Sequence, residues 1–161
     1  MHPLGANCRG RGRNRAVELS SSAFAAGRPI PRWYSCEGED LSPPLAWSGV
    51  PEDAASLALI VDDPDAPVGT FTHWLAWGMS PADGGLVEGG RPAREGRNDF
   101  RQIGYRGPCP PPGGGPHRYF FRLYALAREP DVAAGAGRGE LERALAQSTI
   151  AVAELVGRYQ R

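Results

Sequence analysis

The stretch SLALIVDDPDAPVGTFTHWLAWGM, residues 56–79, indicates the fold, because two short apolar runs flank a turn rich in acid and proline. The runs at residues 57–61 and 71–77 are short, and the first is rich in β-forming residues, which is typical of buried strands. Each proline of the turn fixes its own φ angle, has no N–H, and favours an extended backbone in the preceding residue. The turn is therefore stiff, and it holds its carboxylates at the ends of the strands.

The length and composition predict one loop-rich β domain. The 161 residues include 22 glycines and 16 prolines, which separate clear apolar runs. The formal net charge is zero, so the overall charge gives no reason to expect a nucleic acid or a membrane as partner. No apolar run approaches the ~20 residues that a membrane-spanning helix needs. We therefore expect no transmembrane segment and, without a secretory signal pattern, a cytoplasmic protein.

The first residues differ from the rest of the chain by the stretch RGRGRNR at residues 9–15. Such a segment can contact nucleic acid, but we expect residues 1–15 to be a disordered leader or the result of a start codon placed too early. The domain should then span residues 16–161. It should begin with an edge strand, because Val17 and Leu19 alternate with polar residues.

The other predicted elements follow from spacing. The segment 24–44 is rich in turn residues, and the expected core anchors there and just after it are Trp33, Tyr34, Leu45 and Trp47. Residues 80–102 should form a long loop, and the proline- and glycine-rich residues 103–116 should form no regular element.

Residues 117–126 have the most strand-like pattern in the chain, with Tyr119 and Phe121 on the face of His117. In the tail, apolar residues from Leu141 to Tyr159 recur at helical spacing. We therefore expect two short helices there, separated near residues 148–149.

Two of the three histidines lie at the edges of the two strongest strands, each next to a proline-stiffened loop. In a β-sandwich such loop ends can meet at one rim, where one small cavity would be surrounded by Asp63, Asp65, His73, His117 and Tyr119. Imidazole carries a proton near neutral pH and tyrosine donates a hydroxyl, so this set suggests a small anion site. The aspartates would repel a phosphate dianion. We expect them to orient a histidine, or to receive an amine or a protonated phosphate oxygen.

Other chemistries fit the sequence less well. No Gly-x-Ser-x-Gly nucleophile motif is present, and residues 113–115 lack the Lys-Ser/Thr of a phosphate-binding loop. We therefore expect no catalytic residue, no cofactor and no metal. A metal-dependent enzyme that uses Asp63, His73 and His117 remains the less favoured alternative. Arg118 points away from His117 and is expected to support the rim through an ion pair, with Asp65 as its candidate partner.

The three cysteines fit no zinc-binding spacing. Cys36 and Cys109 lie in two loops that are able to approach each other. Reduced, buried thiols are the expectation for a cytosolic protein, and a disulfide is the alternative.

Several motifs in the same order resemble the phosphatidylethanolamine-binding protein family, and within it the bacterial and archaeal branch that is called Raf-kinase-inhibitor-like. These motifs are SPPLAW at residues 42–47, DPDAP at 63–67, FTHWL at 71–75, GYRGPCPP at 104–111, PHRY at 116–119 and LVGRY at 155–159. The resemblance covers about residues 16–161.

The resemblance implies an all-β sandwich of two antiparallel sheets with short C-terminal helices, and a small pocket for phosphate-type groups at one rim. By motif position, the pocket residues are Asp63, His73, His117 and Tyr119, with Asp65 and Pro67 shaping the pocket and Gly107 and Pro108 lining its mouth. The resemblance also implies that a homodimer is an option.

We therefore expect a non-catalytic binding protein for a small phosphorylated or otherwise anionic ligand. The alternative is a protein–protein inhibitor of a protease or a kinase, which would act through the proline-rich rim loop at residues 108–116 and the long loop at residues 80–102.

Overall fold

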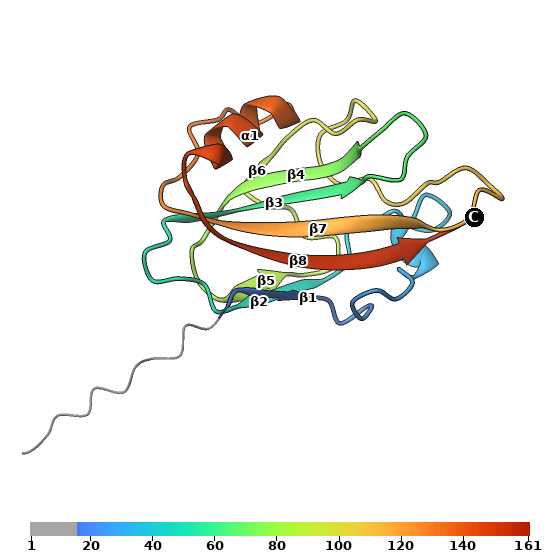
Figure 1. The fold of residues 1–161 in the computed structure, drawn as a ribbon, viewed down its shortest axis with the longest axis horizontal. Helices are drawn as coiled ribbons and strands as arrows, with labels where there is room; N and C mark the ends of the chain where they lie inside the picture. Colours follow the sequence, from blue (N-terminus) through green and yellow to red (C-terminus); the bar gives the residue numbers. More distant parts are fainter. Residues whose placement is uncertain (1–15) are drawn as a thin grey trace, which may run out of the picture.

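The computed structural model describes residues 16–161, which form two antiparallel β-sheets and one α-helix (Figure 1). The elements in chain order are β1 (Glu18–Ser20), the 3-10 helix η1 (Arg32–Tyr34), β2 (Leu45–Ser48), β3 (Ser56–Asp63), β4 (Phe71–Met79), β5 (Gly84–Leu86), β6 (Arg94–Glu95), β7 (His117–Leu126), α1 (Arg138–Ala146) and β8 (Thr149–Tyr159). The predicted leader, residues 1–15, lies outside the described residues.

The molecule has three layers. The five-stranded sheet, in the order β6-β4-β3-β7-β8, lies between α1 and the three-stranded sheet β1-β2-β5 (Figure 1). One apolar cluster, which includes Trp74 and Phe121, fills the space between the sheets. A second cluster, which includes Trp77 and Leu141, lies under α1. The predicted sandwich of two antiparallel sheets is therefore confirmed.

The central strand β3 is buried along its whole length, because both faces of its sheet are covered. Its last two residues face opposite layers, as strand geometry requires. Asp62 contacts Arg138 of α1, whereas Asp63 contacts His117 on the side of the small sheet. This alternation separates the rim site from the helix layer.

A β-bulge in β4 changes the face of one site residue. Val61 pairs with Trp74, but Asp62 pairs with Thr72, so His73 is an extra residue between two cross-strand pairs. A bulge of this kind places two consecutive side chains on the same side of a sheet. Trp74 belongs to the cluster between the sheets, and the His73 ring packs against Tyr119 of that same cluster.

The tail differs from the prediction of two helices. Residues Arg138–Ala146 form α1, but Thr149–Tyr159 form the long strand β8, which pairs with β7 along nearly its whole length. Ala153, Leu155 and Tyr159 are buried, which fits a period of two as well as helical spacing. The β-branched Ile150 and Val152 are exposed, and such residues favour a strand.

Two further expectations were wrong in part. The predicted loop at residues 80–102 contains the short strands β5 and β6, which pair with β2 and β4. Trp33 is 49% exposed, whereas the other expected anchors, Tyr34, Leu45 and Trp47, are buried. The edge strand β1 is present as predicted.

No helix within residues 16–161 is both long enough and apolar enough to cross a membrane.

A disulfide joins Cys36 to Cys109 across 73 residues of sequence. The expectation of reduced thiols was therefore wrong for this structure, and the alternative holds. The bond ties the segment after η1 to the loop at residues 103–116. In addition, the Cys36 N–H donates to the Pro108 carbonyl over 3.0 Å.

Candidate functional site

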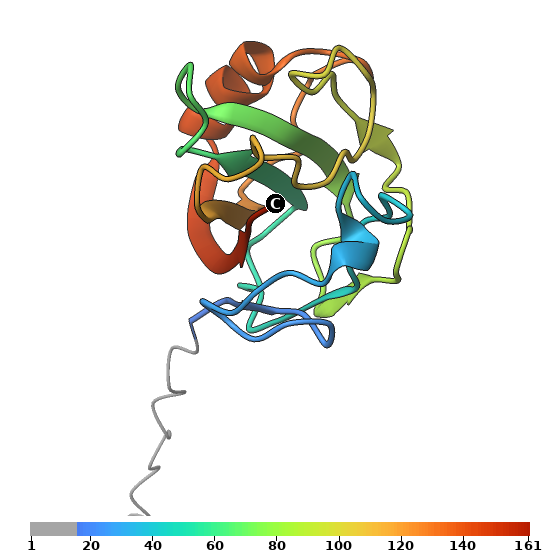
Figure 2. The ribbon, with the colours of Figure 1, turned by 90° about the vertical axis from the view of Figure 1, so that its right-hand side faces the viewer.

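The candidate site lies at one end of the sandwich. The turn between β3 and β4, the loop before β7 and the C-terminus all reach this end, on the right in Figure 1 and facing the viewer in Figure 2. The β3–β4 turn and the loop before β7 are rich in proline, which has no N–H for a strand ladder. Both segments therefore leave the sheet at this end. Residues that are more than 50 positions apart in the chain therefore meet, as the hydrogen bond between Asp63 and His117 shows.

These segments enclose a pocket of about 320 Å³. The polar residues that line it are Asp63, His73, His117 and Tyr119. Its remaining lining is Ala66, Pro67, Val68, Phe71, Phe100, Cys109, Pro110 and Pro111. The pocket is thus a mainly apolar cup with a small group of titratable side chains, which is the usual composition of a ligand site.

His117 and Asp63 form the strongest polar pair of the pocket. Nδ1 of His117 lies 2.7 Å from Oδ2 of Asp63, and both side chains are almost completely buried. A carboxylate only accepts hydrogen bonds, so Nδ1 carries the hydrogen and Nε2 is left for another partner. The other oxygen of Asp63 accepts the backbone N–H of Asp65 over 2.8 Å, which fixes the carboxylate in place.

His73 is oriented in the same way by a different acceptor. Its Nδ1 lies 2.8 Å from the carbonyl oxygen of Arg106, so Nδ1 donates and Nε2 is again left over. The ring has edge contacts with Phe71, Phe100 and Tyr119, each with ring centroids 5.3 Å apart. Burial lowers the pKa of His73 below its usual value of 6.5, against the opposing effects of the Arg106 carbonyl and Asp63. His73 is therefore neutral near neutral pH, and its Nε2 accepts.

Tyr119 lines the same pocket and carries a hydroxyl group. Its side chain is buried, and within residues 16–161 the hydroxyl has no hydrogen-bond partner. Burial, and secondarily the charge of Asp63, raise the pKa of Tyr119 far above the usual range of a phenol, so the group stays protonated. An unpaired buried hydroxyl in a pocket is a feature that a bound ligand or an ordered water would explain.

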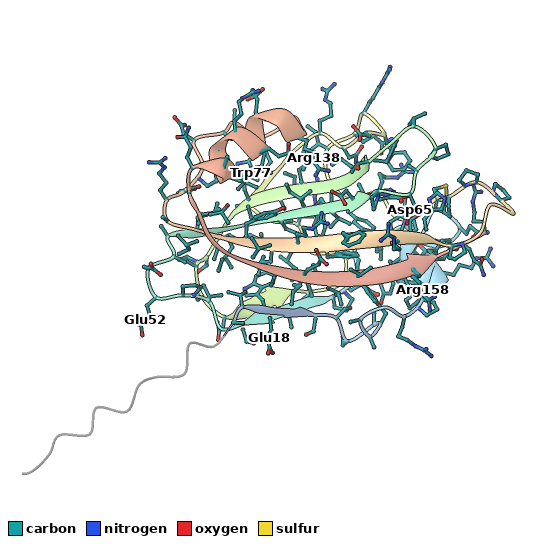
Figure 3. The ribbon with its side chains drawn as sticks, viewed as in Figure 1. Glu18, Glu52, Asp65, Trp77, Arg138 and Arg158 are labelled. Carbon is teal, nitrogen blue, oxygen red and sulfur yellow. A yellow bond between two sulfur atoms is a disulfide. The ribbon has the colours of Figure 1, made fainter. Side chains whose placement is uncertain are left out.

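Asp65 supports the rim and does not line the pocket. Its carboxylate accepts bonds from the backbone N–H, Nε and Nη2 of Arg118, each over 2.9 Å, so the predicted ion pair is confirmed. The hydrogen bond to Arg118 lowers the pKa of Asp65 to about 2. Figure 3 shows Asp65 at the rim end of the sandwich.

Gly107 and Pro108 are buried beside the site and are not part of the pocket lining, contrary to the expectation that they line its mouth. The Gly107 N–H donates to Oδ1 of Asp40 over 2.6 Å. An added Cβ on Gly107 would lie 2.0 Å from the Tyr34 carbonyl oxygen, so only glycine fits there. The wall is formed instead by the next three residues, from Cys109 to Pro111.

The sequence reasoning missed two aromatic walls. Phe71 lies two positions before His73 on the same strand, and this spacing was sufficient to predict that Phe71 also lines the pocket. Phe100 lies in a long segment without periodicity, so no local pattern indicated that it would pack against His73.

The geometry does not favour a metal centre. Within the described part of the chain, no three or more His, Cys, Asp or Glu side chains are placed to hold a metal ion. Both histidines use Nδ1 for protein acceptors, and the Asp63 carboxylate already contacts His117 and the Asp65 N–H.

Comparison with known proteins gives a consistent result. The family model described as phosphatidylethanolamine-binding protein matches residues 20–160. A UPF0098 protein of Pyrococcus abyssi is 46% identical over 166 residues, which cover 98% of this chain and 93% of the relative. The crystal structure of a putative phosphatidylethanolamine-binding protein homologue of Chlamydia trachomatis is 43% identical, with a TM-score of 0.86 and coverage of 91% and 98%. YbcL of Escherichia coli is 31% identical, with a TM-score of 0.85 and coverage of 91% and 99%.

Proposed function

The chain belongs to the phosphatidylethanolamine-binding protein family, and we propose that it is a non-catalytic binding protein whose rim pocket holds a small phosphate-type anion. One observation carries the proposal. Two imidazoles line one pocket, and each has its Nδ1 held by a protein acceptor, which leaves both Nε2 atoms for a ligand.

The two histidines have complementary roles in this proposal. In the complex, His117 keeps its Nδ1–H on Asp63 and donates Nε2–H to an anionic oxygen. Neutral His73 accepts a hydrogen through Nε2, and Tyr119 donates its hydroxyl. A phosphate monoanion has both a charged oxygen and a P–OH group, so it satisfies all three side chains at once.

The apolar wall favours a ligand that carries more than a bare anion. Phe71 and Phe100 pack edge to face, with ring centroids 4.8 Å apart. Together with Pro67 they form an apolar part of the pocket lining, in contact with the His73 ring. This wall strengthens the hydrogen bonds by limiting water, and it accommodates an organic substituent on the phosphate.

The available side chains support binding without catalysis. The sulfur of Cys109 is bonded to Cys36 and is therefore not a free nucleophile. The raised pKa of Tyr119 makes its hydroxyl a poor nucleophile.

Calorimetric titration with inorganic phosphate and phosphoethanolamine tests the proposal. His117→Ala should weaken binding about ten- to a hundredfold, because a hydrogen bond to a charged group contributes ~1.5–3 kcal/mol. Glu154→Gln, on the exposed face of β8, is the matched control and should bind like the parent. An unchanged affinity in His117→Ala would contradict the proposal.

A second candidate is inhibition of a protease or kinase through the rim loop. Residues 111–114 are exposed, while the loop is held by the Cys36–Cys109 disulfide and by Arg161, whose Nε donates to the Pro110 carbonyl. A loop fixed in this way loses little conformational entropy on docking. Replacement of Pro112 by serine would abolish partner capture in this case and leave phosphate binding unchanged.

The predicted cytoplasmic location is a separate proposal with its own test. The disulfide is the state that an oxidising compartment gives, and reduced thiols are the rule in the cytosol. Thiol titration of denatured protein, isolated from its own host without reductant, decides between a cytosolic and an oxidising compartment. Free Cys36 and Cys109 would support a cytosolic location, and a disulfide would contradict it.

A further inference from the structure

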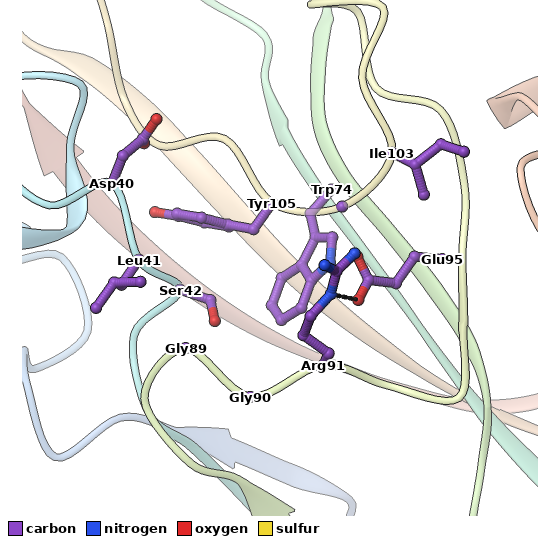
Figure 4. A pocket seen from close by; sticks show the side chains of 11 residues that line it. Asp40, Leu41, Ser42, Trp74, Gly89, Gly90, Arg91, Glu95, Ile103 and Tyr105 are labelled. Atoms are coloured by element: carbon purple, nitrogen blue, oxygen red, sulfur yellow. Dashed lines mark hydrogen bonds and ion pairs between the residues drawn. The ribbon is translucent and has the colours of Figure 1, made fainter.

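A second pocket, of about 170 Å³, lies beside β4 between the segment at residues 40–42, the loop before β6 and residues 103–105 (Figure 4). None of the four polar residues of the rim pocket lines it. Its polar centre consists of Trp74, Arg91 and Glu95, and Figure 4 shows Arg91 and Glu95 beside the Trp74 indole.

Trp74 offers an unused hydrogen-bond donor. Its side chain is only 1% exposed, and its indole N–H has no hydrogen-bond partner within residues 16–161. The other two buried tryptophans are satisfied, because Trp47 donates to the Ala82 carbonyl over 3.0 Å and Trp77 donates to the Val132 carbonyl over 3.1 Å. Buried polar groups are nearly always paired, so the Trp74 N–H indicates a missing acceptor.

Glu95 offers an acceptor next to that donor. Its side chain is 7% exposed, and its Oε1 accepts from Nε of Arg91 over 3.1 Å. This single bond leaves Oε2 of Glu95 and the two Nη groups of Arg91 for a ligand. An added Cβ on Gly104 would lie 2.5 Å from Oε2, so this glycine keeps the space around the carboxylate open.

Arg91 can act as a movable cover over this centre. Its side chain is 73% exposed and lies in a loop, so a change of rotamer meets little resistance. Around the opening, Leu41 and Ile103 are exposed apolar residues, and the Tyr105 ring packs edge-on against Trp74 at 5.5 Å. The pocket therefore combines a buried carboxylate, an exposed guanidinium that covers it, and apolar contacts around the opening.

We propose that this pocket binds a free apolar α-amino acid. The α-ammonium group would donate to Oε2 of Glu95, and the α-carboxylate would accept from Nη of Arg91 and from the Trp74 N–H. The side chain of the ligand would lie against Leu41 and Ile103. A simple anion has no donor for Glu95, and a simple amine leaves the Trp74 N–H unpaired, so the zwitterion fits best. The proposal is independent of the function proposed for the rim pocket.

The indole N–H signals of ¹⁵N-labelled protein provide the test, with Trp74→Phe to assign the Trp74 signal. L-leucine should shift this signal and bind about tenfold or more tightly than acetate or methylamine, each of which carries only one of the two charges. Glycine should bind more weakly than leucine, because it lacks the apolar contact. Phosphoethanolamine at the rim pocket should leave leucine affinity unchanged.

Two variants separate a binding role from a structural role. Glu95→Gln should weaken leucine binding about tenfold or more. Arg91→Gln should have a similar effect, and because Arg91 is at the surface this variant tests the site even if Glu95→Gln does not fold. The control Glu154→Gln should bind leucine like the parent. The proposal would be overturned if leucine did not shift the Trp74 indole N–H signal, or if acetate shifted it equally.

Discussion

Asp62 and Asp63 follow each other on β3 and are equally buried, with exposed fractions of 2% and 3%, yet they belong to different parts of the molecule. Asp62 faces the helix layer and lies 2.8 Å from Arg138 and 3.5 Å from Arg122. Asp63 faces the rim pocket and lies 2.7 Å from His117. Figure 3 shows Arg138 beside α1, away from the rim. Strand alternation alone thus gives the same side chain two roles.

The partners explain the difference between these roles. A guanidinium is charged at every ordinary pH, so Asp62 forms a permanent ion pair that joins α1 to the sheet. An imidazole has two ring nitrogens, so His117 holds Asp63 through Nδ1 while its Nε2 is left for a ligand of the rim pocket. The helix side of β3 is therefore structural, and the rim side is suited to a ligand.

The largest expected effect on stability comes from Asp62→Ala. This variant leaves Arg138 and Arg122 without their buried partner, although Glu142 and Glu154 still contact them, and the loss of two contacts between charged groups costs about 3 kcal/mol. Urea unfolding of the variant and parent measures the change. Phosphoethanolamine affinity should be unchanged at a temperature where the variant is folded. A stability loss no greater than that of Asp63→Asn would remove the distinction between the two sides.

Asp63→Asn should show the reverse pattern. The asparagine oxygen can still accept from His117, but its NH2 group then faces the Asp65 N–H, so we expect a stability loss of about 1–2 kcal/mol. The variant lacks the carboxylate that holds His117 as a donor to an anionic oxygen, so phosphate affinity should fall about tenfold or more. Unfolding and calorimetry on the same sample give both numbers. Full affinity in this variant would show that Asp63 does not tune the pocket.

The third prediction concerns pH and His73. Its pKa is lowered in the folded protein, so below pH 6.5 the unfolded chain binds a proton that the folded protein does not. His73 therefore makes the free energy of unfolding decrease as the pH falls below 6.5, by at most about 1.4 kcal/mol per pH unit. His73→Gln should flatten this dependence in unfolding experiments at a series of pH values. Equal slopes in variant and parent would contradict the burial of His73 in its neutral form.

The smallest effect is expected for the exposed pair of Asp65 and Arg118. Because the folded pKa of Asp65 is about 2, the stabilisation is fully present above its usual value of 3.8 and is lost as the pH falls through 2. Asp65→Asn should lower stability at pH 7 by less than about 1 kcal/mol, since exposed ion pairs contribute little. Well below pH 2 the variant and parent should unfold alike, and a difference that persists there would point to a role beyond the ion pair.

Much of the site was predictable because strand periodicity and turn chemistry are local. The prolines after Asp63 predicted a stiff turn, and the alternation in residues 117–126 correctly placed Tyr119 on the face of His117. The spacing of Leu141 and Leu145 correctly predicted a helix. The same spacing was misleading beyond residue 148. The separation of Val152 and Leu155 is compatible with a helix, but pairing with β7 makes this segment a strand.

The remaining features depend on contacts between distant segments. The bulge at His73 is a mismatch with β3, and the sequence of β4 alone does not reveal it. The disulfide between Cys36 and Cys109 requires that two loops meet, and Phe100 reaches the pocket from a segment without regular pattern. The burial of Trp74 beside Glu95 has the same origin, since the chain between them passes through β5 of the small sheet and returns to β6 of the five-stranded sheet.

The most direct test of the rim pocket is a titration of ¹⁵N-histidine-labelled protein with phosphoethanolamine, observed at the ring nitrogens. The Nε2 signals of His73 and His117 should both shift on binding, whereas their Nδ1 signals should stay close to their positions in the free protein, because Nδ1 remains on Arg106 and Asp63. If neither Nε2 signal moves, or only the Nδ1 signals respond, the two imidazoles are not the ligand-binding groups of this pocket.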